Sequence, residues 1–323
     1  MRFSTLPIAS IGVLCAMLGS LSFSLNDMGI KFLSGDYPLH QIVFARASIG
    51  LLLTLLILMP LEGGYKLIRT KRLGIHLVRG GLVMMANFLF FMGLAEIPLS
   101  EATAIFFVAP LIITVFSVVF LSEKVGPWRW FAVGMGLFGA VLMLRPTPSS
   151  FQLASLLPLA SAFCYAGLHV LTRKIGATEK ASTMAFYIQL CFVVSSLMMG
   201  LFFGDGAYQD QDSAALRFLL RPWVWPTVSA DMTIMIGIGV ASAFGGYSIS
   251  QAYRLSEAAL IAPFEYLALV LSVVWGIFVF NEHPDQLAWI SIGLIIAGGM
   301  LMLWREAVAN KKPKVISRLP VQR

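Results

Sequence analysis

One long pattern occurs twice in this sequence, and it combines apolar runs with a short acidic turn. Residues 99–145 contain an apolar run, an acidic turn and a Gly-rich apolar run, and residues 255–304 repeat this order with a three-residue change in spacing. Because internal duplication of this kind marks repeated structural units, the sequence predicts a chain made of two related halves. The corresponding positions are Ser100, Glu101, Ala102, Glu123, Trp130 and Gly139 in the first copy, and Ser256, Glu257, Ala258, Glu282, Trp289 and Gly298 in the second.

The composition of the chain fits a protein that lies in a lipid bilayer. Of its 323 residues, 58% are hydrophobic and only 12% are charged, values typical of integral membrane proteins. The net charge of +7 does not indicate a nucleic-acid-binding surface, because the basic residues lie in the breaks between apolar runs. In those positions they act as topology signals. The expected surroundings are therefore a lipid bilayer, and no nucleic-acid partner is expected.

The apolar runs predict an all-α integral membrane protein. A helix needs about 20 apolar residues to cross the hydrocarbon core. Long continuous runs without two-residue alternation favour helices over a β-barrel. Ten runs meet this criterion, five in each half, and they predict ten transmembrane helices. The predicted spans are 8–32, 39–60, 77–96, 100–121, 128–145, 151–174, 181–204, 231–253, 257–280 and 286–304.

The distribution of Lys and Arg predicts the orientation of these spans. If the N-terminus is cytoplasmic, most of the 23 basic residues fall on the cytoplasmic side, including those of the 66–79 loop. Both termini are then cytoplasmic, and five spans per half place the second half upside down relative to the first. We expect a first repeat at 1–148, a second at 149–305, and a basic cytoplasmic tail at 306–323.

Small residues predict close helix packing in the fifth and tenth spans. A Gly-rich pattern in the fifth span lies inside an apolar helix with no preceding strand, so it does not indicate a dinucleotide-binding loop. The expected packing residues are Gly134, Gly136 and Gly139 in one span, and Gly293, Gly298 and Gly299 in the other.

Two charged residues inside the first two spans are expected to interact. Unpaired polar groups are costly at membrane depth, so they mark packing devices or transport pathways. Asp27 lies late in the first span, and Arg46 lies about two turns into the second. We expect an Asp27–Arg46 ion pair near the outer face. It either clamps the two helices together or supplies one member to bind a charged part of a substrate.

Other polar and aromatic residues are expected to line a central cavity. Tyr165 and His169 share one helix face at i, i+4, and Tyr247 and Gln251 do the same. A single His or Gln within a helix bundle more often makes an interhelical hydrogen bond than it binds a ligand, but the recurrence of such residues in both halves favours a lined cavity. The predicted substrate-binding residues are Asn87, Tyr165, His169, Tyr247, Gln251, Tyr266 and Trp275.

Glu265 is the candidate for proton coupling. It is an acid in mid-span, two residues after Pro263. A carboxyl held in an apolar environment can take up and release a proton during transport. The alternative is a protonated carboxyl that serves only as a structural hydrogen-bond donor.

The sequence contains no recognisable catalytic, metal or cofactor motif. Its four histidines are scattered, its three cysteines are widely separated, and no GxxxxGKS-type loop for ATP-driven pumping occurs. We therefore expect no enzyme activity, no metal and no cofactor. A passive channel and an intramembrane enzyme are the weaker alternatives to a carrier.

The chain resembles the drug/metabolite transporter superfamily, and within it the EamA-type ten-helix members. The resemblance covers roughly residues 8–305 and rests on the duplicated ends, with Pro110, Glu123, Trp130 and Gly136–Gly139 in the first half. The segments of the second half that carry it are APFEYLALV and FNEHPD within 262–285, followed by Trp289 and Gly298.

This resemblance implies two inverted five-helix repeats around a central cavity, with the fifth and tenth helices at the back. It implies a secondary active transporter of the bacterial inner membrane that moves a small polar or amphipathic metabolite by alternating access. Export of an amino acid or related compound is the leading expectation, and import of a vitamin or cofactor such as riboflavin or S-adenosylmethionine is the alternative. The expected partners are the small-molecule substrate and the bilayer, with protons as the candidate coupling ion and a monomer or homodimer as the assembly.

Overall fold

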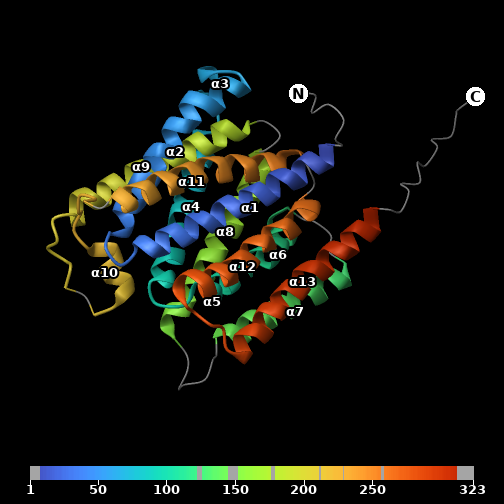
Figure 1. The fold of residues 1–323 in the computed structure, drawn as a ribbon. Helices are drawn as coiled ribbons and strands as arrows, with labels where there is room; N and C mark the ends of the chain where they lie inside the picture. Colours follow the sequence, from blue (N-terminus) through green and yellow to red (C-terminus); the bar gives the residue numbers. More distant parts are fainter. Residues whose placement is uncertain are drawn as a thin grey trace, which may run out of the picture.

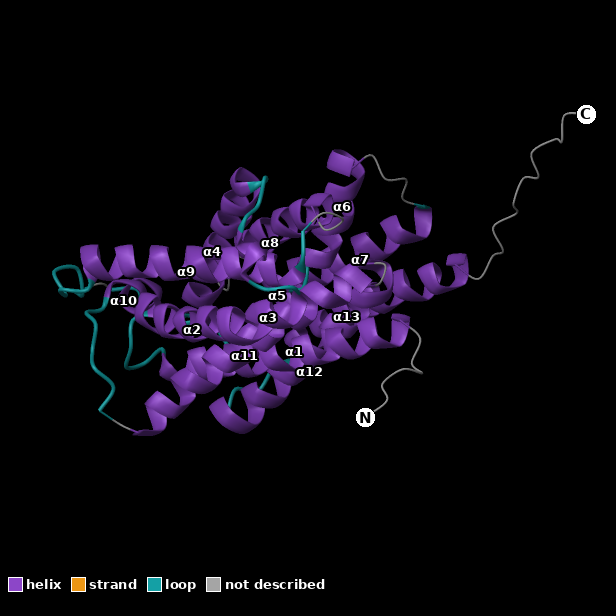
Figure 2. Cartoon of the chain, turned by 90° about the horizontal axis from the view of Figure 1, so that it is seen from above, coloured by secondary structure: helices purple, strands orange, loops and turns teal. Residues whose placement is uncertain are grey.

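The protein folds as a bundle of helices, and the part of the chain that the structure describes contains no strand (Figures 1 and 2). A computed structural model describes residues 8–121, 126–144, 152–175, 179–210, 212–227, 229–255 and 258–310. The predicted acidic turn at Glu123, the link at 145–150 and residues 311–323 of the predicted tail lie outside these ranges. The helices are α1 (Ile8–Leu33), α2 (Leu39–Leu53), η1 (Thr54–Leu58), α3 (Met59–Glu62), η2 (Tyr65–Ile68), α4 (Leu73–Leu94), α5 (Leu99–Phe106), α6 (Ala109–Leu121), α7 (Pro127–Leu144), η3 (Leu153–Ser155), α8 (Leu156–Ile175), α9 (Ala181–Phe203), α10 (Ala214–Leu220), α11 (Ser229–Leu255), α12 (Ala258–Phe280) and α13 (Gln286–Asn310).

The predicted all-α fold class is confirmed, and the described helices follow the predicted spans closely. Seven of them are long and apolar enough to cross a membrane. Three shorter apolar helices, Trp130–Met143, Phe264–Phe280 and Gln286–Leu301, occupy the other predicted spans within the described residues. Many large apolar side chains on the outside of the bundle are exposed, including Leu56 at 67% and Phe278 at 79%. Such a surface is suited to lipid contact.

The fourth predicted span is broken, which the sequence reading of one continuous helix at 100–121 did not anticipate. A turn at Phe107 and Val108 separates α5 from α6. Pro110 explains the break, because it has no N–H to donate and its ring clashes with the carbonyl four residues earlier, that of Phe106. The break therefore leaves backbone carbonyl groups in the middle of the bundle without regular helical partners.

The helices of the two halves interleave in a regular way. Helix α1 packs against α11 and α12, while α8, the first long helix of the second half, packs against α4 and the α5–α6 pair. Helix α2 packs against α9 and α11, and α9 packs in turn against α4. Helices α7 and α13 pack against each other and lie side by side at the edge of the bundle (Figure 1). The packing of α1 against α11 and α12 thus resembles that of α8 against α4 and the α5–α6 pair, and the packing of α2 against α11 resembles that of α9 against α4.

Glycines set the close approach of α7 and α13. A Cβ on Gly298 would lie 2.9 Å from the Ala132 carbonyl oxygen and 3.1 Å from the Gly136 nitrogen, so backbone meets backbone at this point. A Cβ on Gly139 would lie 3.0 Å from side chains of α13. Gly134 and Gly293, by contrast, face open space. Gly136 and Gly299 are also close-packed, the first against Leu111 of α6 and the second against Tyr266 of α12. Four of the six predicted packing glycines therefore lie at close contacts between helices.

The connection between α9 and α11 is fixed to the bundle. Trp223 packs against Gly200 of α9, where a Cβ would lie 2.6 Å from the indole ring. The Gln41 side chain of α2 makes two hydrogen bonds with the backbone of Val224, the residue after Trp223. It donates to the Val224 carbonyl at 2.6 Å and accepts from the Val224 N–H at 3.0 Å. Trp225 remains 79% exposed, as expected for a residue at a membrane interface.

A carboxylate caps the short helix α10 within this connection. Glu96, in the turn after α4, accepts hydrogen bonds from the Ser213 hydroxyl at 2.6 Å and the Ala215 N–H at 2.7 Å. These bonds favour the charged form, and they lower the pKa of Glu96 below its ordinary value of 4.5, the Ser213 hydroxyl contributing most. Glu96 thus attaches the connection to the end of α4.

We expect Gly298→Ala to destabilise the protein and Gly134→Ala not to. The added methyl of the first variant must push two backbones apart, which costs about 1–3 kcal/mol. The second adds a methyl in open space and raises helix propensity by about 1 kcal/mol. Thermal unfolding in detergent compares the two purified variants with the wild type. Equal effects of both substitutions would contradict the assigned packing face.

We expect the attachment of α10 to weaken on acidification, because its Glu96 cap acts as a carboxylate. The lowered pKa means that this stabilisation is present above pH 4.5 and is lost as pH falls through the folded-state pKa. Hydrogen exchange of residues 214–220, corrected for intrinsic rates, checks this in the wild type and in Glu96→Gln. The two proteins should differ at pH 7 and converge at low pH, and a difference that persists unchanged would contradict the prediction.

Candidate functional site

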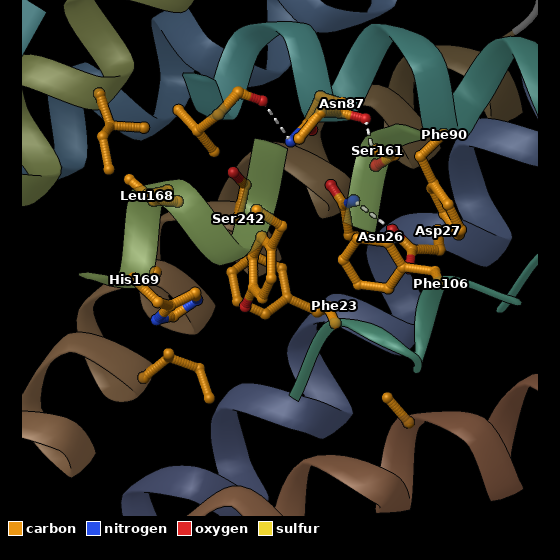
Figure 3. A pocket seen from close by; sticks show the side chains of 18 of the residues that line it. Phe23, Asn26, Asp27, Asn87, Phe90, Phe106, Ser161, Leu168, His169 and Ser242 are labelled. Carbon is orange, nitrogen blue, oxygen red and sulfur yellow. Dashed lines mark hydrogen bonds between the residues drawn. The ribbon is translucent and has the colours of Figure 1, made fainter. Parts of the chain in front are cut away.

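A cavity lies in the middle of the bundle and is lined by helices of both halves (Figure 3). The cavity has a volume of about 210 Å³. Its walls combine apolar and aromatic side chains with polar groups that are otherwise rare at this depth. The charged and polar lining residues are Ser20, Asn26, Asp27, Arg46, Arg79, Asn87, Thr103, Ser161, Tyr165, His169, Thr172, Gln189, Ser242, Ser250 and Glu265.

A buried guanidinium dominates one end of this cavity. Arg46 is only 3% exposed, and it donates to the Asn26 side-chain oxygen at 3.3 Å and to the Asn87 side-chain oxygen at 2.9 Å. Its guanidinium carbon lies 5.0 Å from the ring centre of Phe192 and 5.8 Å from that of Phe91. Two amides and two aromatic faces therefore hold the charge in place.

The predicted direct ion pair between Asp27 and Arg46 does not form. Asn26 stands between them, because its side-chain nitrogen donates to an Asp27 oxygen at 3.0 Å while its oxygen accepts from Arg46. The two charges are thus joined through one amide. Adjacent positions on α1 point about 100° apart, and a hydrogen bond joins the Asn26 and Asp27 side chains across this angle (Figure 3).

A second buried arginine lies nearer the other end of the cavity. Arg79 is 2% exposed; it donates to the Thr172 hydroxyl at 3.0 Å, and its Nη1 lies 3.4 Å from Nδ1 of His76. His76 stacks on Tyr187 and lies 3.6 Å from a Glu179 oxygen. Because Arg79 and Asn87 are eight residues apart on α4, the two polar ends are separated by about 12 Å along that helix.

Aromatic rings occupy the walls between the two polar ends. Phe106 lies at the break between α5 and α6, and it contacts Phe90 and Tyr165 with ring centres 5.2 and 5.0 Å apart. Tyr165 in turn contacts His169 at 4.3 Å. Phe23 also lines this part of the cavity (Figure 3). The arrangement offers stacking surfaces to a flat or apolar group and polar contacts beyond them.

Six of the residues singled out in the sequence line this cavity, and four do not. Asn87, Tyr165, His169, Glu265, Asp27 and Arg46 belong to it. Tyr247 and Gln251 share a face as expected, but that face meets Glu62, whose carboxylate accepts from both at 3.3 and 2.8 Å. On α11 the cavity is lined instead by Ser242, Gly246 and Ser250, about 100° away around the helix.

The other two residues outside the cavity join helices to one another. The Tyr266 ring packs over Gly299 of α13, where a Cβ would collide with it. Trp275 donates from its indole nitrogen to the Ser24 hydroxyl at 2.9 Å and so connects α12 to α1. Both are therefore packing residues in this structure, although their residue types suit a binding site equally well.

Arg79 is the main lining residue that the sequence reading missed. It was counted with the basic 66–79 loop, but α4 begins at Leu73 and carries Arg79 into the bundle. Gln189, a polar residue in the middle of the seventh predicted span, is another lining residue outside the predicted set. The signal that could have found Arg79 is its place within an apolar run, where a charge is rarely tolerated without a role.

A charged cluster lies at the end of α1 beyond Asp27. Lys31 of α1 donates to a Glu282 oxygen at 2.6 Å and to the Ile97 carbonyl at 3.3 Å. The other Glu282 oxygen accepts from the Leu99 N–H at 2.9 Å and so caps α5. This cluster joins α1, the turn before α5 and the turn between α12 and α13.

We expect Lys31 and Glu282 to be energetically coupled. Their side chains are 11% and 24% exposed, so removing one charge leaves the other poorly solvated. A double-mutant cycle with Lys31→Met and Glu282→Gln should give a coupling free energy of about 0.5–3 kcal/mol in denaturant or thermal unfolding. The glutamine still accepts from the Leu99 N–H, so the cycle isolates the ion pair. Strict additivity would contradict the coupling.

Comparison with known proteins identifies the family of this chain. The sequence profile of the EamA-like transporter family matches residues 10–145 and again residues 152–304. A riboflavin transporter of Vibrio cholerae is 28% identical over 309 residues, which cover 95% of this chain and 97% of that protein. The pseudopaline exporter CntI of Pseudomonas aeruginosa is 27% identical, covering 92% and 95%. An S-adenosylmethionine uptake transporter of Rickettsia bellii is 26% identical, covering 94% and 97%.

The fold is also found among solved structures. One crystal structure matches with a TM-score of 0.68 at 20% sequence identity, over 93% of this chain and 99% of that chain. The family and these relatives are transporters and not enzymes, in agreement with the expectation from the sequence. The chain therefore belongs to the EamA-like transporter family and is a multi-pass membrane protein.

Proposed function

We propose that this protein is a secondary active transporter that carries a small polar or amphipathic metabolite across the bacterial inner membrane by alternating access. The observation that carries the proposal is the central cavity, which lies between helices of both halves and has polar groups at each end. Substrate sites of secondary transporters lie near the membrane midplane at the interface of two repeats. The position and chemistry of this cavity fit that plan.

The proposed architecture has ten transmembrane helices in two inverted repeats, at 1–148 and 149–305. The mirrored packing of the helices supports it, since α1 meets α11 and α12 as α8 meets α4 and α5–α6. The two separate matches to the family profile agree with the same division. The bias of basic residues toward one side supports cytoplasmic termini.

The closed end and the broken helix suggest how access alternates. The Lys31–Glu282 cluster joins α1 to the turns before α5 and after α12, so it seals the end that the charge bias assigns to the outside. Lining residues such as Thr172 and Ser250 continue toward the opposite end. Access to the cavity from the outside then requires the Lys31–Glu282 ion pair to separate, while the helices near Arg79 move together and close the opposite end. The break at Phe107 and Val108 gives the bundle a natural point of bending.

The proposed cargo is an amino acid or related compound, with export as the leading direction. Charged groups of both signs at the cavity support a zwitterionic or amphipathic solute, and one relative is named as an exporter. Import of a vitamin or cofactor is the alternative, which the relatives named for riboflavin and S-adenosylmethionine favour. The aromatic walls suit the flat rings of either class.

Glu265 is proposed to couple transport to protons. It lines the cavity from α12 and is 8% exposed. A carboxyl in this position can exchange a proton with the cavity while substrate is absent. Glu62 provides the comparison, because its carboxylate lies outside the cavity, where it accepts from Tyr247 and Gln251.

Flux into proteoliposomes tests these proposals. Labelled phenylalanine, leucine, riboflavin and S-adenosylmethionine are offered to vesicles that are empty or preloaded with the same unlabelled compound, with and without a proton gradient. The expected result is saturable uptake of one compound that accelerates on preloading, because a carrier returns faster when loaded. Stimulation by the gradient should disappear in Glu265→Gln and persist in Glu62→Gln.

Each alternative has its own result. Uptake that neither saturates nor accelerates on preloading would indicate a channel, and a chemically altered product would indicate an enzyme. Stimulation by the gradient that survives in Glu265→Gln would remove this residue from proton coupling while leaving the carrier intact.

A further inference from the structure

The two buried arginines of the cavity lack direct counterions. Among the residues that the structure describes, no carboxylate oxygen lies within 4.0 Å of either Arg46 or Arg79. Their hydrogen-bond partners are side chains that carry no full negative charge, two amides for Arg46 and a hydroxyl and an imidazole for Arg79. A buried charge in a membrane is costly unless it is paired. A ligand that brings negative charge into the cavity would reduce this cost.

Arg46 has a free donor for such a ligand. Its Nη1 and Nη2 are taken by Asn26 and Asn87, but its buried Nε has no hydrogen-bond partner. The Thr103 hydroxyl and the Gln189 side-chain oxygen, which line the same cavity, are also buried without partners. Buried polar groups in folded proteins are nearly always bonded. Of these atoms the Arg46 Nε–H and the Thr103 hydroxyl can donate to an acidic oxygen, whereas the Gln189 oxygen can only accept. The Arg46 Nε–H is the one that carries positive charge, so it is the donor that we assign to a bound acid.

We propose that the transported solute carries an acidic group, a carboxylate or a phosphate, and that Arg46 is the residue that binds and selects it. Asn26 and Asn87 hold the guanidinium in place, and Phe91 and Phe192 cover its faces. The apolar part of the solute then lies along the phenylalanine walls. The inference deepens the proposed transport function and rests on it.

Asp27 limits which acids fit. Its carboxylate is held by Asn26 next to Arg46, so it repels a plain anion and attracts a neighbouring ammonium group. An α-amino acid headgroup presents both charges on adjacent atoms and matches this pair. A phosphate brings more negative charge and no ammonium group. The two sources of acidic oxygens are therefore separable by experiment.

Binding to the purified wild-type protein in detergent tests the selection. The probes are two matched pairs, phenylalanine with phenylalaninamide and riboflavin 5′-phosphate with riboflavin. We expect the acidic member of at least one pair to bind about 10- to 100-fold more tightly than its neutral or amide partner, as expected for a charge-assisted hydrogen bond. The pair that shows this difference identifies the carboxylate or the phosphate. Equal binding within both pairs would overturn the proposal.

Variants assign the selection to one arginine. Arg46→Gln should reduce the preference for the acidic probe to about threefold or less, and Arg46→Lys should retain part of it, because lysine keeps the charge but not the planar fork. Arg79→Gln tests the second arginine of the cavity and should reduce the preference less than Arg46→Gln does, since Thr172 and His76 already engage that side chain. Loss of the preference in Arg79→Gln with its retention in Arg46→Gln would transfer the site to the other end of the cavity.

Thermal unfolding of Asn87 variants without added ligand tests the same inference, and its result does not depend on which probe compounds were chosen. Asn87→Asp places a carboxylate where an amide oxygen now lies 2.9 Å from Arg46, and it should raise the midpoint of thermal unfolding while abolishing acid binding. Asn87→Leu removes the acceptor without adding charge and should lower the midpoint. If Asn87→Asp is destabilised as much as Asn87→Leu, Arg46 does not need an anion and the inference fails. If none of the labelled compounds is transported in the flux experiment but Asn87→Asp unfolds at a higher temperature than the wild type, the proposed cargo is wrong. The assignment of Arg46 as a site for an acidic group then still stands.

Discussion

The structure depends on one constraint, which is that polar groups inside a bilayer must find partners within the protein. Water is absent from the hydrocarbon core, so each unpaired polar group costs several kcal/mol. The protein meets this demand with short chains of hydrogen bonds between helices. One of them runs from Asp27 through Asn26 and Arg46 to Asn87. Where a buried donor has no hydrogen-bond partner, as at the Arg46 Nε, we propose that a ligand supplies the acceptor. The same rule therefore explains both the packing and the site.

The break between α5 and α6 shows how a repeated sequence can give different local structure. Pro110 in the first half interrupts the helix and exposes Phe106 to the cavity, whereas α12 of the second half continues through Pro263. The two halves therefore contribute different walls to one site. An asymmetric cavity is suited to an asymmetric solute, because each end can then recognise a different group.

The sequence predicted the helices well because the length of a continuous apolar run can be read from neighbouring residues alone. It also predicted that Asn87, Tyr165, His169 and Glu265 share one environment, and the structure brings them to the same cavity. It could not separate them from Tyr247, which is equally polar and lies on a helix that also lines the site. Whether a residue of α11 faces the cavity depends on its direction around the helix axis. Gly246 lines the cavity, whereas the next residue, Tyr247, points about 100° away and donates to Glu62.

From the sequence alone come the membrane environment, the helical fold class, the duplication and the family resemblance, because composition and periodicity encode them residue by residue. Only the tertiary structure decides which polar groups meet. Asn26 separates Asp27 from Arg46, and Arg79 lies inside the bundle and not in the basic loop beside it. These outcomes follow from how the helices around the cavity pack together, and no single helix carries that information. The cavity and its two arginines are therefore properties of the assembled bundle.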